Sequence, residues 1–349
     1  MINDRSRPAI APARRSGGVP SPRQQRGVAL LVAILLVAFG TIIAAAMAYD
    51  NAMTARRAAA TFEFDQAVLV AEGAESVAAY GLQLTAKSNP SYIGPGQPWS
   101  TPLPPSEVTP GVTLEASLED LQGRFNVNDL VMTDGNTPNT AAIAAFQRLL
   151  TSLNLDPKLA DLIVDWIDKN TEPMDDGAED SVYMEMDPPY RTPNLPITST
   201  SELLAMPGVT RAEFDRLAPY IVALPLGVQI NTCDAKAIVL DALTGHQQWS
   251  TLSPQEFAQD RTASGGCFPS PADVLTAAGD VQTGAVAGGV TPSGGGVQQS
   301  ISGLLTEKSN WFRLTSYVTL GTAEFSVYTL LYQDQTGMVR PELRSFTPD

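Results

Sequence analysis

The feature that most constrains this chain is an uncharged segment, Val28 to Tyr49, that follows an arginine-rich start. Residues 1–27 contain six arginines and one aspartate, with Pro, Gly and Ser between them. A helix as long as the uncharged segment rises about 33 Å at about 1.5 Å per residue, enough to span the apolar core of a bilayer. The arginines favour a cytoplasmic N-terminus. The sequence therefore predicts one membrane anchor, followed by an exported region.

Three interpretations of this start stay open at this point. A secretory signal peptide would be cut near Ala46-Met47-Ala48, although such peptides have apolar cores of only about 7–15 residues. A plain single-pass anchor would not be cut at all. In the third interpretation, the stretch Arg26-Gly27-Val28-Ala29-Leu30-Leu31 resembles a prepilin processing site. The resemblance implies that a prepilin peptidase cuts after Gly27 and methylates the new amine of Val28.

Helical periodicity continues beyond the apolar segment. From Ala52 to about Ala86 the chain carries good helix formers with apolar residues at helical spacing, and Pro90 with the Pro/Gly-rich stretch 94–98 ends the pattern. A membrane helix that runs into an amphipathic one resembles the architecture of type IV pilins and pseudopilins.

One position departs from the pilin pattern. Most pilins carry Glu five residues into the mature chain, where it is thought to neutralise the terminal amine of the subunit ahead; this chain has Val32 there. A carboxylate in an apolar bundle is costly unless it is paired. A subunit with no neighbour ahead of it needs no such carboxylate. In lacking this Glu, the chain resembles one subclass of the family, the minor pseudopilin K of type II secretion. That subclass is assigned to the filament tip.

Composition restricts the partners and the compartment. Without residues 1–27 the formal net charge changes from −15 to −20, which argues against nucleic acid or an anionic membrane surface as a partner. The two cysteines, Cys233 and Cys267, fit an oxidising periplasm, either as one disulfide or as two unrelated buried thiols. The single His246 leaves little room for His-based catalysis or a His-rich zinc site.

The chain is predicted to be mostly helical from Asn139 to about Leu243, and two stretches in it are alike. Leu149–Ile167 aligns without gaps to Leu203–Ile221. The matching positions are turn residues Asn154 and Gly208, apolar residues Leu155 and Val209, and N-caps Asp156 and Thr210. The pattern indicates two helical hairpins.

The second copy is similar to a DNA-binding helix-hairpin-helix, but its chemistry does not fit. That motif needs Gly at the position of Thr210, and Glu202, Glu213 and Asp215 surround the turn. A structural hairpin is therefore the better interpretation, and no nucleic acid is expected.

Between the two hairpins lies the densest acidic run of the chain, from Asp165 to Asp187. Such a run repels itself unless it is solvated or bound to a cation, and hard oxygen ligands on a flexible loop favour Ca²⁺ over zinc. The predicted ligands are Asp168, Glu172, Asp176, Glu179 and Asp180. A solvated acidic loop is the alternative.

The same run carries the strongest family resemblance. Asp165-Trp166-Ile167-Asp168, Gly177-Ala178-Glu179-Asp180 and Pro188-Pro189-Tyr190-Arg191 followed by Asn194 resemble the signature of the K pseudopilins. The stretch Leu121 to Asn128 also resembles a segment of that family. This resemblance implies calcium binding in a helical insert.

In the C-terminal part, apolar and polar residues alternate with a period of two. Ser264 to Ser302 is rich in Gly, Ser, Thr and Ala and is predicted to be a loop or linker. Residues 312–320 and 325–331 alternate as strands, a third strand follows the turn at 334–337, and 111–131 reads as an earlier strand and turn.

The expected fold class is α+β: a pilin-like long helix and small antiparallel sheet with a large, mostly helical insertion. The expected domains are a cleaved leader (1–27), a transmembrane segment (28–52), pilin-like helix and first strands (53–128), a helical insertion (129–305) and completing strands (306–349).

The resemblance implies a non-enzymatic minor pseudopilin in the inner membrane, with its exported domain in the periplasm. The implied partners are other minor pseudopilins, the prepilin peptidase and the inner-membrane assembly platform, with the secretin and secreted substrates as further candidates. Two alternatives stay open: an adhesin-like tip pilin of a type IV pilus, and an anchored hydrolase.

Overall fold

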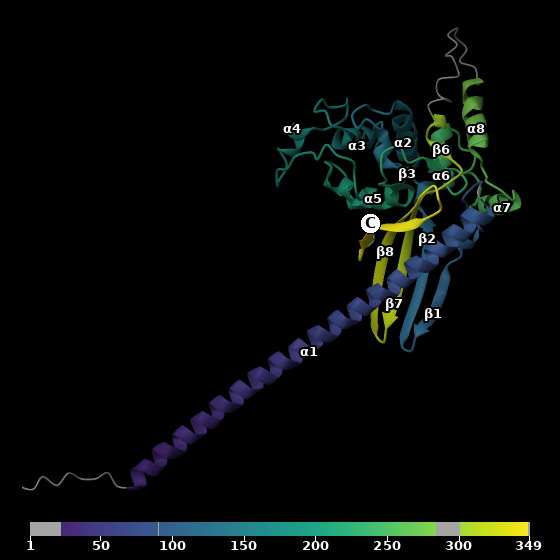
Figure 1. Ribbon diagram of the computed structural model, residues 1–349. Coiled ribbons are helices and arrows are strands. Elements are labelled where there is room, and N and C mark those ends of the chain that lie inside the picture. Colours follow the sequence, from purple (N-terminus) through teal and green to yellow (C-terminus); the bar gives the residue numbers. More distant parts are fainter. Residues whose placement is uncertain (1–21, 90, 284–300, 348–349) are drawn as a thin grey trace, which may run out of the picture. The chain divides into compact units, whose positions relative to one another are not determined.

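The computed structural model describes residues 22–89, 91–283 and 301–347, so that most of the expected leader lies outside it. The chain divides into two units, Met1–Phe64 and Asp65–Asp349. Helix α1 (Pro22–Ser88) is the long helix of Figure 1 and contributes to both. Within the described residues, one helical segment, Val28–Ser88, is long and apolar enough to cross a membrane.

In the second unit, α1 packs against the sheet through small side chains. Ala67, Ala71, Ala74 and Leu82 are buried, and their spacing of three or four residues, or a multiple of it, places them on one helix face. The alanines let the helix backbone approach the sheet closely. The helix ends at Ser88, close to the predicted end.

The sheet has five antiparallel strands in the order β1-β2-β7-β8-β9. Their bounds are β1 (Leu103–Thr109), β2 (Val112–Asp120), β7 (Trp311–Leu320), β8 (Ala323–Gln333) and β9 (Val339–Ser345). Strands β2 and β7 pair from Val112 opposite Leu320 to Asp120 opposite Phe312. Figure 1 shows these two distant parts of the sequence side by side. The predicted alternation is confirmed.

Strand β1 was not predicted, because Pro104 and Pro105 disguise it. Proline cannot donate to a ladder and is confined to edges and bulges. Strand β1 is an edge strand with irregular register, and the other edge strand, β9, carries Pro341. Both edges of the sheet are therefore poor templates for a further strand.

The chain between β2 and β7 forms the helical region, Leu121–Thr306. Its α-helices are α2 (Thr140–Ser152), α3 (Leu159–Ile167), α4 (Asp180–Tyr183), α5 (Arg211–Leu217), α6 (Ala237–Thr244), α7 (Pro254–Ala263) and α8 (Pro271–Thr283). Its 3-10 turns are η2 (Leu121–Gly123), η3 (Val127–Leu130), η4 (Thr200–Ala205) and η5 (Ala218–Tyr220). Its short strand pairs are β3 (Phe125–Asn126) with β4 (Ile221–Val222), and β5 (Ile230–Asn231) with β6 (Leu305–Thr306), both parallel.

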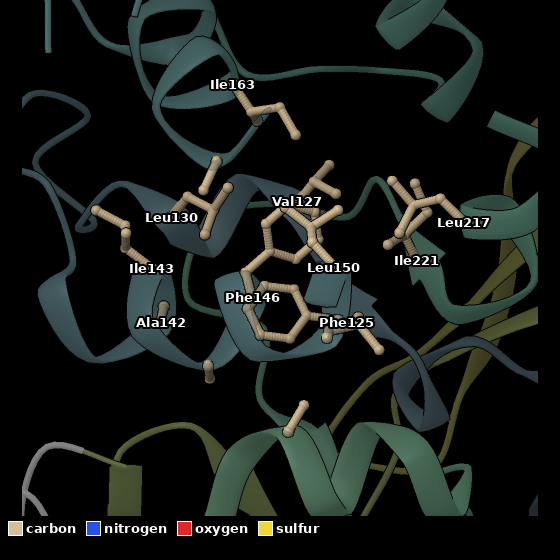
Figure 2. Close-up of a cluster of buried hydrophobic side chains, with 14 of the residues drawn as sticks. Phe125, Val127, Leu130, Ala142, Ile143, Phe146, Leu150, Ile163, Leu217 and Ile221 are labelled. Carbon is tan, nitrogen blue, oxygen red and sulfur yellow. The ribbon is translucent and has the colours of Figure 1, made fainter. Parts of the chain in front are cut away.

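One large apolar core joins most of these elements, and Leu121, Val222 and Leu224 form a smaller second cluster. The rings of Phe125 and Phe146 pack at 5.1 Å between centroids, tilted by 36°, and Leu130, Ile163 and Leu217 of three other elements lie around them (Figure 2). The stretch Leu121–Asn128, which the sequence singled out, therefore supplies part of this core.

The two hairpins are confirmed at their turns. Asn154 and Gly208 both have left-handed backbone conformations, with φ of 53° and 80°. Thr210 is the N-cap of α5 in a capping box with Glu213. Asp156 caps the turn that leads into α3, since its side chain accepts the Lys158 amide, although the regular helix begins only at Leu159 and its boundary residue Lys158 makes no side-chain cap bond.

Two other predictions need correction. Residues 168–199 are mostly irregular rather than helical, because their polar groups bond locally instead of in helical register. The stretch from Ser264 is not only a linker, since α8 occupies Pro271–Thr283. Ser270 and Asp273 cap each other's amides at its start, and Val274 is buried. Residues 284–300 of the expected loop lie outside the described part.

A buried polar cluster links the sheet to the helical region. The Asp120 carboxylate, at the end of β2, accepts from the Gln122 amide, the Asn231 side chain and the Ser309 hydroxyl. Burial, and then the charge of Asp234, raises the pKa of Asp120 to about 8. A disulfide between Cys233 and Cys267 ties β5 to the segment before α8.

Candidate functional site

The acidic loop between α3 and η4 holds two buried carboxylates. Asp168 is the first residue after α3, and Glu179 is the residue before the short helix α4. Only 1% of Asp168 and 5% of Glu179 is exposed. Carboxylates are almost never so deeply buried without a partner of opposite charge. These two side chains therefore require an explanation.

Among the residues that the structure describes, each of these carboxylates has one oxygen with a hydrogen-bond partner and one oxygen without. The Asn170 side chain donates to Asp168 Oδ2 at 2.7 Å, and the Thr192 hydroxyl contacts Glu179 Oε2 at 3.5 Å. Within the described residues, Asp168 Oδ1 and Glu179 Oε1 are buried and accept no hydrogen bond. The side-chain oxygen of Asn194 is a third such atom. Three buried oxygen acceptors of one loop thus lack a donor.

The electrostatics of the loop agree with this geometry. Burial raises the pKa of Asp168, and burial followed by the charge of Asp168 raises that of Glu179. Burial also raises the pKa of Asp165 to about 7, with Glu179 and Asp168 adding to the shift. The negative charges face one another, and a cation between them would reverse these shifts.

Asp165 supports the loop rather than facing solvent. It is fully buried, and its carboxylate accepts the Met174 amide at 3.0 Å. Gly177 lies directly against it: a Cβ at this glycine would sit 1.9 Å from Asp165 Oδ2. The glycine of the signature is therefore required by the close approach of the loop to Asp165.

The other predicted ligands lie in different surroundings. Glu172 is exposed, and Asp176 is exposed and forms an ion pair with Lys158 at 2.7 Å. Asp180 lies near Glu179, where its Oδ1 accepts from the amide and hydroxyl of Thr192. From the predicted set, the structure brings Asp168 close to Glu179, while Asp180 follows Glu179 in the chain and also pairs with Arg191 at 3.5 Å.

Sequence reasoning did not count Asn194 among the ligands. Its backbone is left-handed, with φ of 48°, and its amide nitrogen donates to the Asn170 carbonyl at 3.1 Å. This bond fixes which end of the amide faces the loop interior. The available signal was an Asn just after the Pro-Pro-Tyr-Arg motif, because Asn tolerates this backbone conformation better than most residues.

The donor set suits a hard cation. It consists of carboxylate and amide oxygens, the ligands that Ca²⁺ prefers. No group of three His, Cys, Asp or Glu side chains in the described ranges is arranged to hold a metal by itself. An ion here would therefore also need the Asn194 amide and further oxygen ligands. The residues present fit calcium on these terms.

An aromatic cluster packs beside the loop. The Trp166 and Tyr183 rings meet edge to face at 5.3 Å, and Tyr183 also packs against Tyr190 at 5.4 Å. Tyr183 is fully buried between α3 and the loop. Trp166, one of the four tryptophans of the chain, therefore contacts the residues that follow the acidic loop.

Comparison with known proteins agrees with the signature residues. Residues 123–226 match the family described as "Type II secretion system (T2SS), protein K". The type II secretion system protein K of Klebsiella pneumoniae is 32% identical over 251 residues, covering 69% of this chain and 77% of that protein. That of Pectobacterium carotovorum subsp. carotovorum is 31% identical over 322 residues, covering 88% and 93%. The chain belongs to the type II secretion system protein K family.

The protein K fold is also found in a solved structure. A chain in the crystal structure of the GspK-GspI-GspJ complex from the enterotoxigenic Escherichia coli type 2 secretion system matches with a TM-score of 0.67. The sequence identity is 21%, and the match covers 84% of this chain and all of that one. The predicted α+β fold, with a long helix, an antiparallel sheet and substantial helical content, is confirmed.

Membership of the protein K family makes this chain a type II secretion minor pseudopilin rather than a type IV pilus adhesin. Its apolar N-terminal helix fits a membrane anchor. Val28 and Val32 lie on that helix with more than half of each side chain exposed, and Gly27 precedes them within α1. Cleavage after Gly27 stays a prediction.

Proposed function

We propose that this chain caps the tip of the type II secretion pseudopilus and helps to initiate its assembly, and thereby protein export across the outer membrane. One observation carries the proposal: Val32 occupies the position at which most pilins carry Glu. A subunit with an apolar residue there lacks the group that would neutralise the amine of a subunit ahead. Such a subunit suits the first position of a filament.

The size of the helical region supports the same position. Leu121–Thr306 is inserted between two neighbouring strands of the pilin-like sheet. A bulky insert is difficult to repeat at every step of a tightly stacked filament, whereas an end has open space beyond it.

The proposed partners are other minor pseudopilins. The fold neighbour was crystallised with GspI and GspJ, and we extend this kind of heteromeric assembly to the present chain. We further propose cleavage by a prepilin peptidase between Gly27 and Val28, contact with the inner-membrane assembly platform, a periplasmic location for the region after the anchor, and no catalytic activity. Contacts with the secretin or with secreted substrates would follow from a tip position.

We also propose that the acidic loop binds Ca²⁺ through Asp168 and Glu179, with the Asn194 amide oxygen and Asp180 as neighbouring oxygen donors. The support is the set of buried oxygens without donors. Bound calcium would hold the end of α3, the start of α4 and the segment before η4 in one arrangement.

The tip position is tested on filaments sheared from cells that assemble pseudopili. An antibody against the helical region, carrying gold, should mark one end of each filament, while an antibody against the major pseudopilin should mark the whole length. Labelling along the filament would refute the tip assignment. In the same cells, Val32→Glu should give no gain in assembly relative to Val32→Gln, because no amine lies ahead to be neutralised.

A further inference from the structure

A pocket of about 330 Å³ lies in the helical region, and all of its lining residues are outside the acidic loop. Four segments meet there: the chain from η3 to Thr133, the start of α2, the chain before β5 and the chain before β6. The volume is at the lower end of the range for small-molecule sites, about 300–1,000 Å³. We call it the Asp129 pocket, because Asp129 is the one ionisable side chain among the described residues that line it.

The Asp129 side chain is buried without a counter-charge. Only 5% of the residue is exposed. Its Oδ1 accepts the Gly227 amide at 2.8 Å, and the Asn126 side chain adds a weaker interaction. Burial raises the pKa of Asp129 to about 7, and no charge of the described residues contributes to this shift. Carboxylates this deeply buried are rare in proteins unless they are paired.

The charges next to the pocket do not supply the missing partner. Asp134 follows Thr133 of the lining and is exposed. The Lys169 ammonium donates to the Asp134 carbonyl at 2.8 Å, so these two residues add one charge of each sign beside the pocket. Residues 284–300, which lie outside the described part, contain no Lys, Arg or His. The carboxylate of Asp129 therefore sets the charge of the pocket.

The start of α2 does not turn this pocket into an anion site. Amides at the start of a helix favour negative charge. The Asn139 side chain already accepts the Ala142 amide as the cap of this helix, and the carboxylate of Asp129 would repel an anion in the same pocket. The ligand expected here is a cation.

The donors and acceptors of the pocket favour a primary ammonium group over other cations. A guanidinium pairs best with both oxygens of a carboxylate, and the Gly227 amide already occupies one oxygen of Asp129. A hard metal ion needs several oxygen ligands, and no group of three acidic, His or Cys side chains in the described ranges is arranged to hold one. An ammonium is a compact charge with three donors. The amide oxygen of Gln229 offers it a second acceptor in the lining, since the nitrogen of that amide donates to the Gly303 carbonyl at 3.0 Å.

We propose that the Asp129 pocket binds a primary ammonium group carried on an unbranched alkyl chain, as in a lysine side chain. Val131, Met132 and Leu304 of the lining supply apolar contacts for the alkyl part, and Asp129 pairs with the charge. Leaving one partner of a buried charge pair without the other is costly, so binding depends on the charge of both groups. This site is independent of the proposed tip position and of the acidic loop.

The first experiment titrates the full chain in non-ionic detergent with n-butylammonium, which has the alkyl chain and the charge of a lysine side chain. The methyl resonance of Met132 is followed by NMR on protein with isotopically labelled methionine methyl groups, and it is assigned by its loss in Met132→Leu. n-Butylammonium should give a saturable shift. n-Butanol, which lacks the charge, and methylguanidinium should bind at least about tenfold more weakly. Absence of a saturable shift with n-butylammonium, or an equal affinity for n-butanol, would overturn the inference.

Two matched variants then assign the charge. Asp129→Asn keeps the shape of the side chain and still accepts the Gly227 amide, and it should lower the affinity for n-butylammonium at least about tenfold. Asp134→Asn removes the exposed acid beside the pocket but still accepts the amides of Asn136 and Thr137, and it should change the affinity by less than about twofold. Equal affinity of the wild type and Asp129→Asn would contradict the proposal. The comparison of n-butylammonium with n-butanol on the wild-type chain decides the matter without any variant.

A last comparison identifies the source of the ammonium group. Nα-acetyl-lysine N-methylamide carries the same alkylammonium on a peptide backbone. If it binds as tightly as n-butylammonium, the pocket admits a lysine side chain of another protein. If it binds at least about tenfold more weakly, the pocket takes a free alkylamine. Either result supports the ammonium site, provided that binding of both probes weakens in Asp129→Asn; a lysine probe whose binding ignores this variant would overturn it.

Discussion

Two buried glutamates of this chain differ in the partners of their carboxylate groups. Glu75, on α1, is 7% exposed and accepts two hydrogen bonds from the Arg344 guanidinium, at 2.7 and 2.8 Å, and one from Thr329 at 2.9 Å. Glu179, in the acidic loop, is equally buried, but one oxygen has only a 3.5 Å contact to Thr192 and the other has no partner among the described residues.

The difference separates two ways of stabilising a buried charge. On α1 and the sheet, the charge of Glu75 is balanced by the polypeptide itself through Arg344. The acidic loop gathers Asp168 and Glu179 without any described cationic side chain between them. An uncompensated buried charge is strongly unfavourable. These carboxylates are therefore expected either to hold protons or to bind a cation from solution, and the second possibility is the basis of the calcium proposal.

The largest expected effect is the loss of calcium from the acidic loop. Binding to the native state alone stabilises by about 2–4 kcal/mol when the free ion exceeds its Kd by a hundred- to a thousandfold. Chelation should lower the melting temperature of the full chain in detergent, followed by the fluorescence of its four tryptophans. Calcium should restore it and magnesium should not, because magnesium gives up its water shell reluctantly.

Paired variants distinguish ligands from bystanders. Asp168→Asn with Glu179→Gln keeps the shape of the site but removes its charge, and it should abolish the calcium response. Glu172→Gln with Asp176→Asn changes two exposed acids of the same loop and should keep most of the response. If chelation leaves the wild-type melting temperature unchanged, the loop is a solvated acidic segment that binds no calcium. The contrast between Glu179 and Glu75 would then give no evidence for a bound ion.

A smaller effect is expected at Glu75. Glu75→Gln leaves Arg344 without its bidentate partner, and hydrogen bonds to charged groups contribute about 1.5–3 kcal/mol. The matched control is Glu72→Gln, because Glu72 is more exposed and contacts Arg344 only at 3.2 Å; it should cost less than about 1 kcal/mol. Both losses should be the same with and without calcium. A calcium-dependent loss at Glu75 would show that the two regions are coupled.

Sequence periodicity predicted the long helix and the C-terminal strands of the sheet well. The alternation from Phe312 to Leu320 identifies β7 because one face of that strand is buried, and the long helix follows from helical spacing with a proline after it. Strand β1 and helix α8 were not predicted. At β1 the prolines suppress the strand signal, and at α8 the small-residue composition hides a short capped helix that Val274 and Ala278 bury against the core.

The candidate site was predictable only in part, for a physical reason. Sequence gives the density of acidic residues but not which of them become buried. Asp168 is positioned by the C-terminus of α3, and Glu179 by the N-terminus of α4. Glu172 and Asp176 lie on exposed stretches of the same loop. The contribution of Asn194 depends on a local left-handed turn and on its bond to the Asn170 carbonyl, neither of which has a spacing rule.

The smallest expected effect is a pH dependence with opposite signs in the two states of the acidic loop. Without calcium, burial raises the pKa of Asp165 to about 7 and raises those of Asp168 and Glu179. The folded state then keeps protons that the unfolded chain releases above about pH 4. Stability should therefore fall as the pH rises from about 4 towards about 7.

With calcium the sign reverses, because the ion binds deprotonated carboxylates and its contribution grows with pH. The difference in unfolding free energy between calcium-loaded and calcium-free protein should widen from about pH 5 to about pH 8. Taking this difference cancels the other acids with raised pKa values, namely Asp120, Asp129, Asp161 and Asp234. Asp165→Asn should flatten the calcium-free curve while leaving calcium binding in place, since Asn can still accept the Met174 amide. A difference that stays constant across this range would mean that calcium does not act through these carboxylates, and Glu179 would then need another partner to balance its burial.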